Sequence, residues 1–256
     1  MGVLNVTPDS FFAPSRAPRD DAAIALGRSL VSHGAGILDV GGESTRPGAT
    51  PVDVDVELDR VLPVLHALAG SCRLSVDTVK PQVARAAVAA GATLLNDVSG
   101  ALGPLAAELG VGWVSMHHRG IPAARTGGMG SGAVAEVAAH VLAGARAARD
   151  AGVDEVYVDP GFGFGKDVAD NLALLAHLAE LCRAAHDEGF GVLVGASRKR
   201  FLGALPNGGP LEAEDRFEGS LATAVYAMTC GADVVRVHDV EATVQAASLV
   251  ADGEAA

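Results

Sequence analysis

The chain has 256 residues, of which 49% are hydrophobic and 4% aromatic, and it carries a formal net charge of −12. An acidic chain without a basic cluster does not favour nucleic acid or an anionic membrane as a partner, although a local pocket of Arg and Lys can still bind a small anion. Three cysteines, Cys72, Cys182 and Cys230, lack metal-ligand spacing, and we expect them to be buried thiols in a reducing compartment. No apolar run reaches membrane-spanning length and no signal peptide is evident, so we expect a cytoplasmic α/β enzyme.

Short runs rich in Val, Leu and Ile alternate with Ala- and Leu-rich helical patterns along the chain. The predicted strands cover residues 2–6, 37–40, 74–76, 93–95, 112–116, 155–158, 191–194 and 233–237. The predicted helices cover residues 20–33, 53–69, 80–90, 103–109, 132–151, 168–187, 211–229 and 239–251. Eight strand–helix units in about 250 residues match a TIM (β/α)₈ barrel.

The whole chain, residues 1–256, is predicted to form a single domain, because no linker-like segment divides it. A doubly wound sheet is the alternative fold, but it usually has a Gly-rich phosphate turn after its first strand, where this chain has NVTPDS. The longest irregular stretches, 7–19, 41–52 and 118–131, all follow predicted strands. Barrel enzymes keep their active sites on that face.

Nearly every predicted strand ends on a polar or ionisable side chain. The residues concerned are Asn5, Asp39, Asp77, Asn96, His117 after Met116, Asp159, Ser197 to Lys199, Arg236 and His238. A lone Asp before a helix is most simply a helix cap, but a full set at corresponding positions predicts a ligand pocket, because buried polar groups need partners.

The predicted pocket has two chemical halves. Asp77, Asn96 and Asp159 offer acceptors that suit the N–H groups of a flat heterocycle such as an amino-pyrimidinone. The other half is cationic or potentially so and suits a phosphate group; it comprises Arg46, Lys199, Arg236 and His238. The residues therefore predict a heterocyclic substrate that bears phosphate.

Other catalytic and binding motifs are not supported. The segment GFGFGKD (161–167) resembles a P-loop, but Pro160 occupies the position of the first Gly and Asp167 that of the magnesium-binding Ser or Thr. No His and Cys cluster has metal-ligand spacing, and Ser197 lacks the context of a nucleophile elbow. Five histidines within helical patterns are predicted to be surface or boundary residues: His33, His66, His140, His177 and His186.

Nine segments of the chain follow the order and spacing of a known family: MGVLNVTPDSF, DVGGESTRPGA, VDTVK, LLNDVSG, MHHRG, DPGFGFGKD, NLALL, SRKRFLG and VRVHD. Over essentially its whole length the chain resembles the bacterial dihydropteroate synthases, which are pterin-binding enzymes. The resemblance implies a pterin-binding TIM barrel of folate biosynthesis. It also implies the reaction of 6-hydroxymethyl-7,8-dihydropterin diphosphate with 4-aminobenzoate to give 7,8-dihydropteroate and pyrophosphate.

The resemblance also implies roles for individual residues. The pterin would be held by Asp77, Asn96, Asp159 and Lys199, with Met116 against the ring. The diphosphate would be held by Asn5, Arg236, Val237 and His238, with Asn5 also a ligand of the cofactor Mg²⁺. The remaining substrate contacts, mostly to 4-aminobenzoate, would come from Phe11, Thr45, Arg46, Pro47, Ser197 and Arg200.

The implied chemistry begins with ionisation of the C–O bond to the leaving pyrophosphate. Magnesium and cationic side chains take up the charge on the leaving group, and carboxylates favour the pterin methylene cation that the arylamine then attacks. The catalytic residues are therefore expected to be Asp77, Asp159, Lys199, Arg236 and His238.

Two departures from the family pattern are evident. Phe12, Ala13, Pro14 and Ser15 stand where the family usually has SDGG, so we expect slower turnover or altered loop closure with substrate binding largely intact. Family members also usually have residues before the segment that matches Met1–Gly2, which leads us to expect a truncated or misassigned start and a weakened first strand.

Two rival functions remain open: a pterin-binding methyltransferase domain, and a non-catalytic paralogue that binds pterin. The diphosphate-binding segments SRKRFLG and VRVHD argue against the first, whereas the change at Ala13 keeps the second in consideration. The resemblance further implies sulfonamide sensitivity and a homodimer. The helix at 211–229 could supply the dimer face through Leu221, Ala224, Val225 and Met228, although packing against the barrel explains the same pattern.

Overall fold

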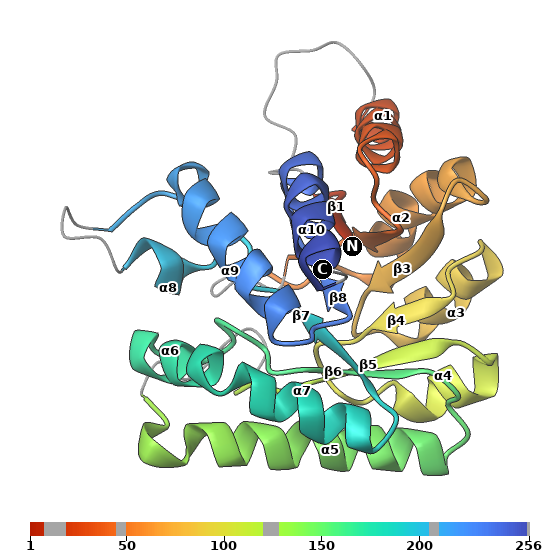
Figure 1. The fold of residues 1–256 in the computed structure, drawn as a ribbon. Coiled ribbons are helices and arrows are strands. Elements are labelled where there is room, and N and C mark those ends of the chain that lie inside the picture. The colour runs from red at the N-terminus through yellow and green to blue at the C-terminus, as the bar shows by residue number, and fades with distance from the viewer. Residues whose placement is uncertain (8–18, 45–49, 120–127, 205–209, 255–256) are drawn as a thin grey trace.

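Eight parallel strands follow one another around a single sheet in chain order (Figure 1). The computed structural model describes residues 1–7, 19–44, 50–119, 128–204 and 210–254, of which residues 19 and 251–254 are described by their backbone alone. The strands are β1 (Gly2–Asn5), β2 (Ile37–Gly41), β3 (Arg73–Asp77), β4 (Leu94–Asn96), β5 (Gly112–Met116), β6 (Val156–Asp159), β7 (Gly191–Val194) and β8 (Val234–Val235).

The sheet closes on itself through the backbone just after β8. Gly2 forms a parallel bridge with Val237. The N–H of Val3 donates to the carbonyl of Val237 at 3.0 Å, and the N–H of Val237 donates to that of Met1 at 2.9 Å. Strand order and closure together confirm the predicted (β/α)₈ barrel.

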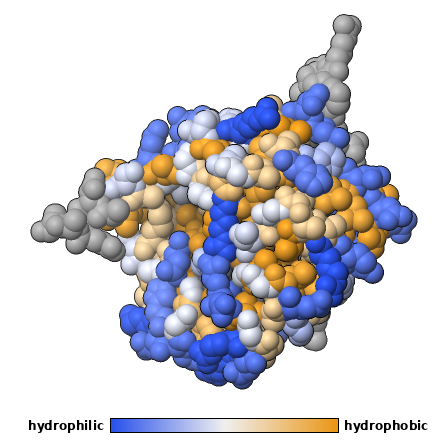
Figure 2. Space-filling view, turned by 90° about the vertical axis from the view of Figure 1, so that its right-hand side faces the viewer, coloured by the Kyte–Doolittle hydropathy of each residue, from blue (hydrophilic) through white to orange (hydrophobic). Residues whose placement is uncertain are grey.

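Helices form an outer layer around the strands (Figure 1). They are α1 (Arg19–Ser32), α2 (Val54–Leu68), α3 (Pro81–Ala89), α4 (Gly103–Leu109), α5 (Ala133–Asp150), α6 (Val168–Ala176), α7 (Leu178–Asp187), α8 (Arg200–Gly203), α9 (Phe217–Thr229) and α10 (Val240–Glu254). Short 3₁₀ turns, Gly130–Gly132 and Glu214–Arg216, precede α5 and α9. On the face of the molecule shown in Figure 2, hydrophilic residues are interspersed with hydrophobic ones.

The core is built mainly from Leu, Val and Ala, because the strands are covered on both faces and aromatic residues are scarce. The helices contribute buried side chains such as Val61, Leu65 and Leu68 of α2. Among the described helices, none is long and apolar enough to cross a membrane.

Two predicted helices differ from those observed. The pattern at 168–187 forms two helices, α6 and α7, that meet at His177, and no Gly or Pro in this stretch marks the break. The pattern at 211–229 becomes α-helical only at Phe217, after the 3₁₀ turn Glu214–Arg216. Its first residues are not part of the α-helix, because the backbone of Leu211 forms other hydrogen bonds. Its N–H donates to the Gly203 carbonyl, and its carbonyl accepts from the Arg216 guanidinium. Helix α8 was not predicted.

The thiol prediction was partly wrong. Cys182 is buried, but Cys72 and Cys230 are only partly buried, and all three are free cysteines. The predicted surface position of the five helical histidines is confirmed, since each is exposed.

The loop after β6 turns back sharply onto the end of β5. Gly161 has φ +65°, and a Cβ atom there would lie 1.9 Å from the carbonyl oxygen of His117. Lys166 fixes the same approach, because its Nζ donates to the carbonyls of His117 and Gly161 at 3.2 and 2.8 Å. Only glycine therefore fits at position 161.

We predict that Gly161→Ala lowers the free energy of unfolding by about 2–5 kcal/mol, since it adds overpacking to left-handed backbone strain. Gly189→Ala is the matched control, because Gly189 also has positive φ (+80°) but nothing lies within 4 Å of the Cβ atom that the substitution would add. That variant should lose about 1–2 kcal/mol. Urea unfolding measures both; equal losses would contradict the close approach to His117.

Candidate active site

The carboxyl ends of β1 to β4 place their last residues side by side in register. Asn5 pairs with Gly41, Gly41 with Asp77, and Asp77 with Asn96. Paired residues of parallel strands point to the same face, here the barrel interior. A Cβ atom on Gly41 would lie 3.4 Å from Cβ of Asp77 and 3.5 Å from Oδ1 of Asn5, so the glycine leaves space between these two side chains.

The next two strands continue the ring. Met116 at the end of β5 pairs with Asp159 at the end of β6, and both side chains are buried. The N–H of Gly161 donates to Oδ1 of Asp159 at 2.7 Å. Burial raises the pKa of Asp159, although this hydrogen bond and the nearby Lys199 oppose the shift.

Arg236, just after β8, reaches across the barrel to two carboxylates. Its Nε donates to Asp39 Oδ2 at 2.6 Å and its Nη2 donates to Asp77 Oδ2 at 2.9 Å. Burial works against the charge of the guanidinium, but Asp39 and Asp77 hold the pKa of Arg236 above its ordinary value. The pair of ion pairs links β2, β3 and β8 at the centre of the pocket.

Asp77 retains one oxygen that the described part of the protein does not satisfy. Its Oδ1 is buried and has no hydrogen-bond partner among the described residues. Burial raises the pKa of Asp77 to about 7, with Arg236 opposing the shift and Asp39 adding to it. A buried, unpaired carboxylate oxygen is costly unless a ligand supplies a donor.

Lys199 approaches the pocket from the turn after β7. Its Nζ lies 3.9 Å from the centroid of the Phe164 ring, in a cation–π contact. A Cβ atom on Gly163 would lie 3.1 Å from Cδ of Lys199, so glycine at 163 lets the lysine stem cross the loop after β6.

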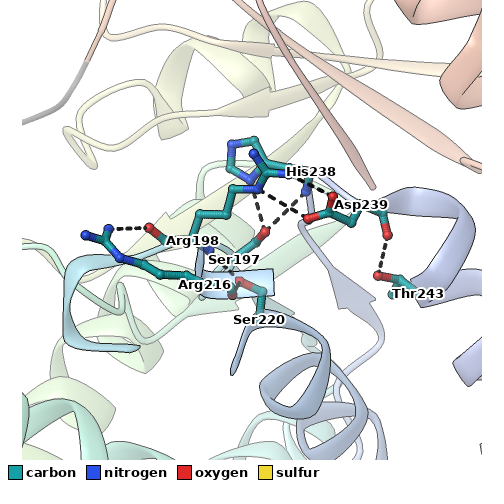
Figure 3. Close-up of polar contacts among 7 residues, drawn as sticks. All are labelled: Ser197, Arg198, Arg216, Ser220, His238, Asp239 and Thr243. Atoms are coloured by element: carbon teal, nitrogen blue, oxygen red, sulfur yellow. Dashed lines mark hydrogen bonds and ion pairs between the residues drawn. The ribbon is translucent and has the colours of Figure 1, made fainter. Parts of the chain in front are cut away.

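The turn that carries Ser197 and Lys199 is held in a strained conformation. Arg198 has φ +58°, which is rare for a residue with a side chain. Figure 3 shows how the turn is clamped: the Arg198 N–H donates to Ser220 Oγ at 2.8 Å, and its guanidinium donates to Asp239 at 2.8 and 3.3 Å. Arg216 adds a hydrogen bond to the Arg198 carbonyl.

The same clamp joins the turn to His238. Ser197 Oγ and His238 Nδ1 lie 3.0 Å apart (Figure 3). The residues that follow these two, Arg198 and Asp239, form the ion pair described above. Burial, with Arg236 and Arg198 nearby, lowers the pKa of His238 to about 3. His238 is therefore neutral in this structure, although the sequence placed it among the potentially cationic groups.

The structure brings most of the predicted site residues together at one edge of the barrel. Those found there are Asn5, Asp77, Asn96, Met116, Asp159, Ser197, Lys199, Arg236, Val237 and His238. Arg200 opens α8 on the same side but is exposed. Phe11, Thr45, Arg46 and Pro47 lie outside the described residues.

Two residues at this site were missed or misplaced. Asp39 lies in the middle of β2, one inward-facing layer below Gly41, and not at the strand end as predicted. Its signal was a carboxylate within the apolar run ILDVG, in register with Ser75. Lys166, considered only as a P-loop lysine, is buried beside the site, and burial lowers its pKa to about 7.

The donor set suits magnesium only with help from a substrate. No group of three His, Cys, Asp or Glu side chains among the described residues could hold a metal ion. Asn5 nevertheless offers a half-buried amide oxygen at the pocket edge. Mg²⁺ often takes one or two protein oxygens and completes its shell with phosphate and water, so Asn5 fits this use.

Comparisons with known proteins agree with this geometry. Residues 1–238 match the family model described as pterin binding enzyme. The dihydropteroate synthase of Mycobacterium leprae is 46% identical over 98% of this chain and 91% of its own length. That of Escherichia coli K12 is 42% identical over 98% and 89%. The solved dihydropteroate synthase of Xanthomonas albilineans superposes with a TM-score of 0.90 at 46% identity, covering 100% of this chain and 92% of that one. The chain thus belongs to the dihydropteroate synthases of the pterin-binding enzyme family.

Proposed function

We propose that this protein condenses 6-hydroxymethyl-7,8-dihydropterin diphosphate with 4-aminobenzoate, giving 7,8-dihydropteroate and pyrophosphate. One observation carries the proposal: the buried Oδ1 of Asp77 has no hydrogen-bond partner among the described residues, while the other oxygen of the same carboxylate binds the Arg236 guanidinium. Family membership supports it, since the Xanthomonas albilineans enzyme has been solved with 4-aminobenzoic acid and with 7,8-dihydropteroate. We also propose that residues 1–256 form one domain.

The acceptors of the pocket suit the pterin ring. Asp77 and Asp159 accept ring and amino N–H groups, and Asn96 binds the same edge. Lys199 donates to the ring on the opposite side, and the buried Met116 packs against its face. A flat ring with several N–H groups can supply the donor that Asp77 Oδ1 lacks among the described residues.

The diphosphate lies toward β1 and β8 in our proposal. Arg236, His238, the backbone at Val237 and Asn5 line that side, and a neutral His238 can donate from its ring N–H. Asn5 would hold Mg²⁺, which when bound neutralises charge on the departing pyrophosphate. Ser197, Arg200, Phe11, Thr45, Arg46 and Pro47 would contact 4-aminobenzoate or lie near the substrates.

The reaction needs no nucleophilic side chain. The C–O bond to the diphosphate breaks, the electron pair leaves with pyrophosphate, and the pterin methylene becomes cationic. The carboxylates of Asp77 and Asp159 stabilise that cation, while Arg236 and Lys199 stabilise the anionic groups around it. The amine of 4-aminobenzoate then forms the new C–N bond and releases a proton.

The direct test mixes the purified protein with both substrates and magnesium and measures pyrophosphate and dihydropteroate together. We expect equimolar formation of both products and loss of activity with a chelator. If the protein binds pterin diphosphate but forms no product, the non-catalytic alternative is favoured. If it releases no pyrophosphate from the two substrates, the methyltransferase alternative is favoured.

The protonation of Asp77 predicts a pH dependence. Its pKa is about 7, so the ionised form that stabilises the cation is lost as the pH falls through that value. We expect kcat/KM for pterin diphosphate to fall about tenfold per pH unit on the acid side. Asp77→Asn should be slower than wild type at neutral and higher pH and should lack this acid limb, so that the two profiles converge at low pH. A wild-type profile that matches the variant in shape would contradict the role of Asp77.

The segment Phe12 to Ser15 departs from the family and lies outside the described residues. We propose that the missing carboxylate at Ala13 slows turnover. Ala13→Asp should raise kcat by about tenfold with little change in KM, because a carboxylate stabilises the cation. Ser15→Asp adds the same charge at an unmatched position and serves as the control. Unchanged kcat and KM in Ala13→Asp would remove the idea.

We further propose a cytoplasmic homodimer that is sensitive to sulfonamides. The solved Yersinia pestis enzyme is a complex with a sulfonamide drug, which supports the last point. For the dimer, Ala224 of the predicted face is only 5% exposed and belongs to the hydrophobic core. Helices α9 and α10 pack against each other. The large apolar side chains that they expose are Tyr226, Val244 and Leu249.

A further inference from the structure

Asp39 is a buried carboxylate that joins β2 to β3, to β4 and to the backbone just after β8. The residue is 0% exposed in the middle of β2. Its Oδ1 accepts from Ser75 Oγ at 2.6 Å. Its Oδ2 accepts from Asn96 Nδ2 at 2.8 Å and from Arg236 Nε at 2.6 Å. Three of the roughly four acceptor positions of the carboxylate are thus used within the protein, and the side chain is fully buried, so its partners and not a substrate determine its role.

These contacts set the orientation of two groups that line the pocket. Because the carboxylate accepts from the Asn96 amide nitrogen, the amide oxygen of Asn96 must point away from Asp39. Because it also accepts from Nε of Arg236, the flat guanidinium is fixed in plane, and Nη2 reaches Asp77 Oδ2. A rotation of the Asn96 amide would bring its oxygen against the Asp39 carboxylate. A rotation of the Arg236 guanidinium would take the positive charge away from that buried carboxylate.

We propose that Asp39 is a positioning residue of the pterin diphosphate site, which holds the Asn96 amide and the Arg236 guanidinium in the orientations that the substrate requires. The inference rests on the proposed function. It assigns to Asp39 an effect on one substrate and not the other, since Asn96 and Arg236 face the pterin diphosphate in the proposed binding mode.

The test is Asp39→Asn, which keeps the shape of the side chain and removes its charge. The amide can still fit between Asn96, Arg236 and Ser75, but it lacks the negative charge, so the hydrogen bond to the guanidinium becomes weaker and Arg236 is held less firmly in its orientation. We expect KM for pterin diphosphate to rise and kcat/KM to fall by about 10- to 100-fold, with KM for 4-aminobenzoate changed by less than about twofold. Calorimetry with pterin diphosphate should show the same loss of affinity.

Ser75→Ala is the matched control, because it removes a buried partner of Asp39 without touching Asn96 or Arg236. Its kcat/KM should stay within about threefold of wild type even if its Tm falls as far as that of Asp39→Asn. Equal effects of the two variants, or normal pterin diphosphate affinity in Asp39→Asn, would overturn the proposal. Failure of the proposed function is distinct, since the wild-type protein would then bind no pterin diphosphate.

A measurement on the wild-type protein covers the case in which Asp39→Asn does not fold. The Nε–H of Arg236 is bonded to a fully buried carboxylate, whereas Arg85 is exposed and binds Glu108 through its Nη atoms. NMR of ¹⁵N-labelled protein should show slower hydrogen exchange at Arg236 Nε than at Arg85 Nε. Exchange at Arg236 as fast as at Arg85 would overturn the proposal.

Discussion

Two buried carboxylates share one guanidinium at the centre of this barrel. Arg236 arrives from the last strand and pairs with Asp39 on β2 and Asp77 on β3, so the charge interaction spans the seam where the barrel closes. Removing one partner of such a buried set costs about 3–5 kcal/mol, because a charge is left uncompensated. The set therefore ties the closure of the fold to the order of the pocket.

The same arrangement leaves the site ready for a ligand and incomplete without one. Three carboxylates, Asp39, Asp77 and Asp159, lie near Arg236 and Lys199, and one oxygen of Asp77 has no partner among the described residues. A substrate with both N–H donors and negative phosphate groups can pair with the carboxylate oxygens and with the cationic side chains. This is why the geometry agrees with a pterin diphosphate better than with a simple phosphate ester or a neutral heterocycle.

Much of the site follows from the sequence, because the barrel topology itself gathers strand ends. Once eight strands were predicted, Asn5, Asp77, Asn96 and Asp159 had to meet at one edge. The position of Asp39 was predicted wrongly, because it lies one layer deeper in the barrel than the strand ends and its partners come from other strands. Nothing local in ILDVG specifies that Asn96 and Arg236 converge on it.

Features that depend on tertiary packing were also hard to predict. The break at His177 has no Gly or Pro signal, and the late start of α9 depends on hydrogen bonds from Arg216 to Leu211. The neutral state of His238 likewise comes from burial beside two arginines, which a motif does not reveal. In each case the local pattern alone was insufficient to predict the outcome.

The most direct measurement is a crystal structure of the protein with 6-hydroxymethyl-7,8-dihydropterin diphosphate. Our account predicts a ring N–H within hydrogen-bond distance of Asp77 Oδ1, the phosphates beside Arg236 and His238, and Nε of Arg236 still on Asp39. A ligand bound away from Asp77, or an Arg236 that leaves Asp39 to reach the phosphates, would contradict it.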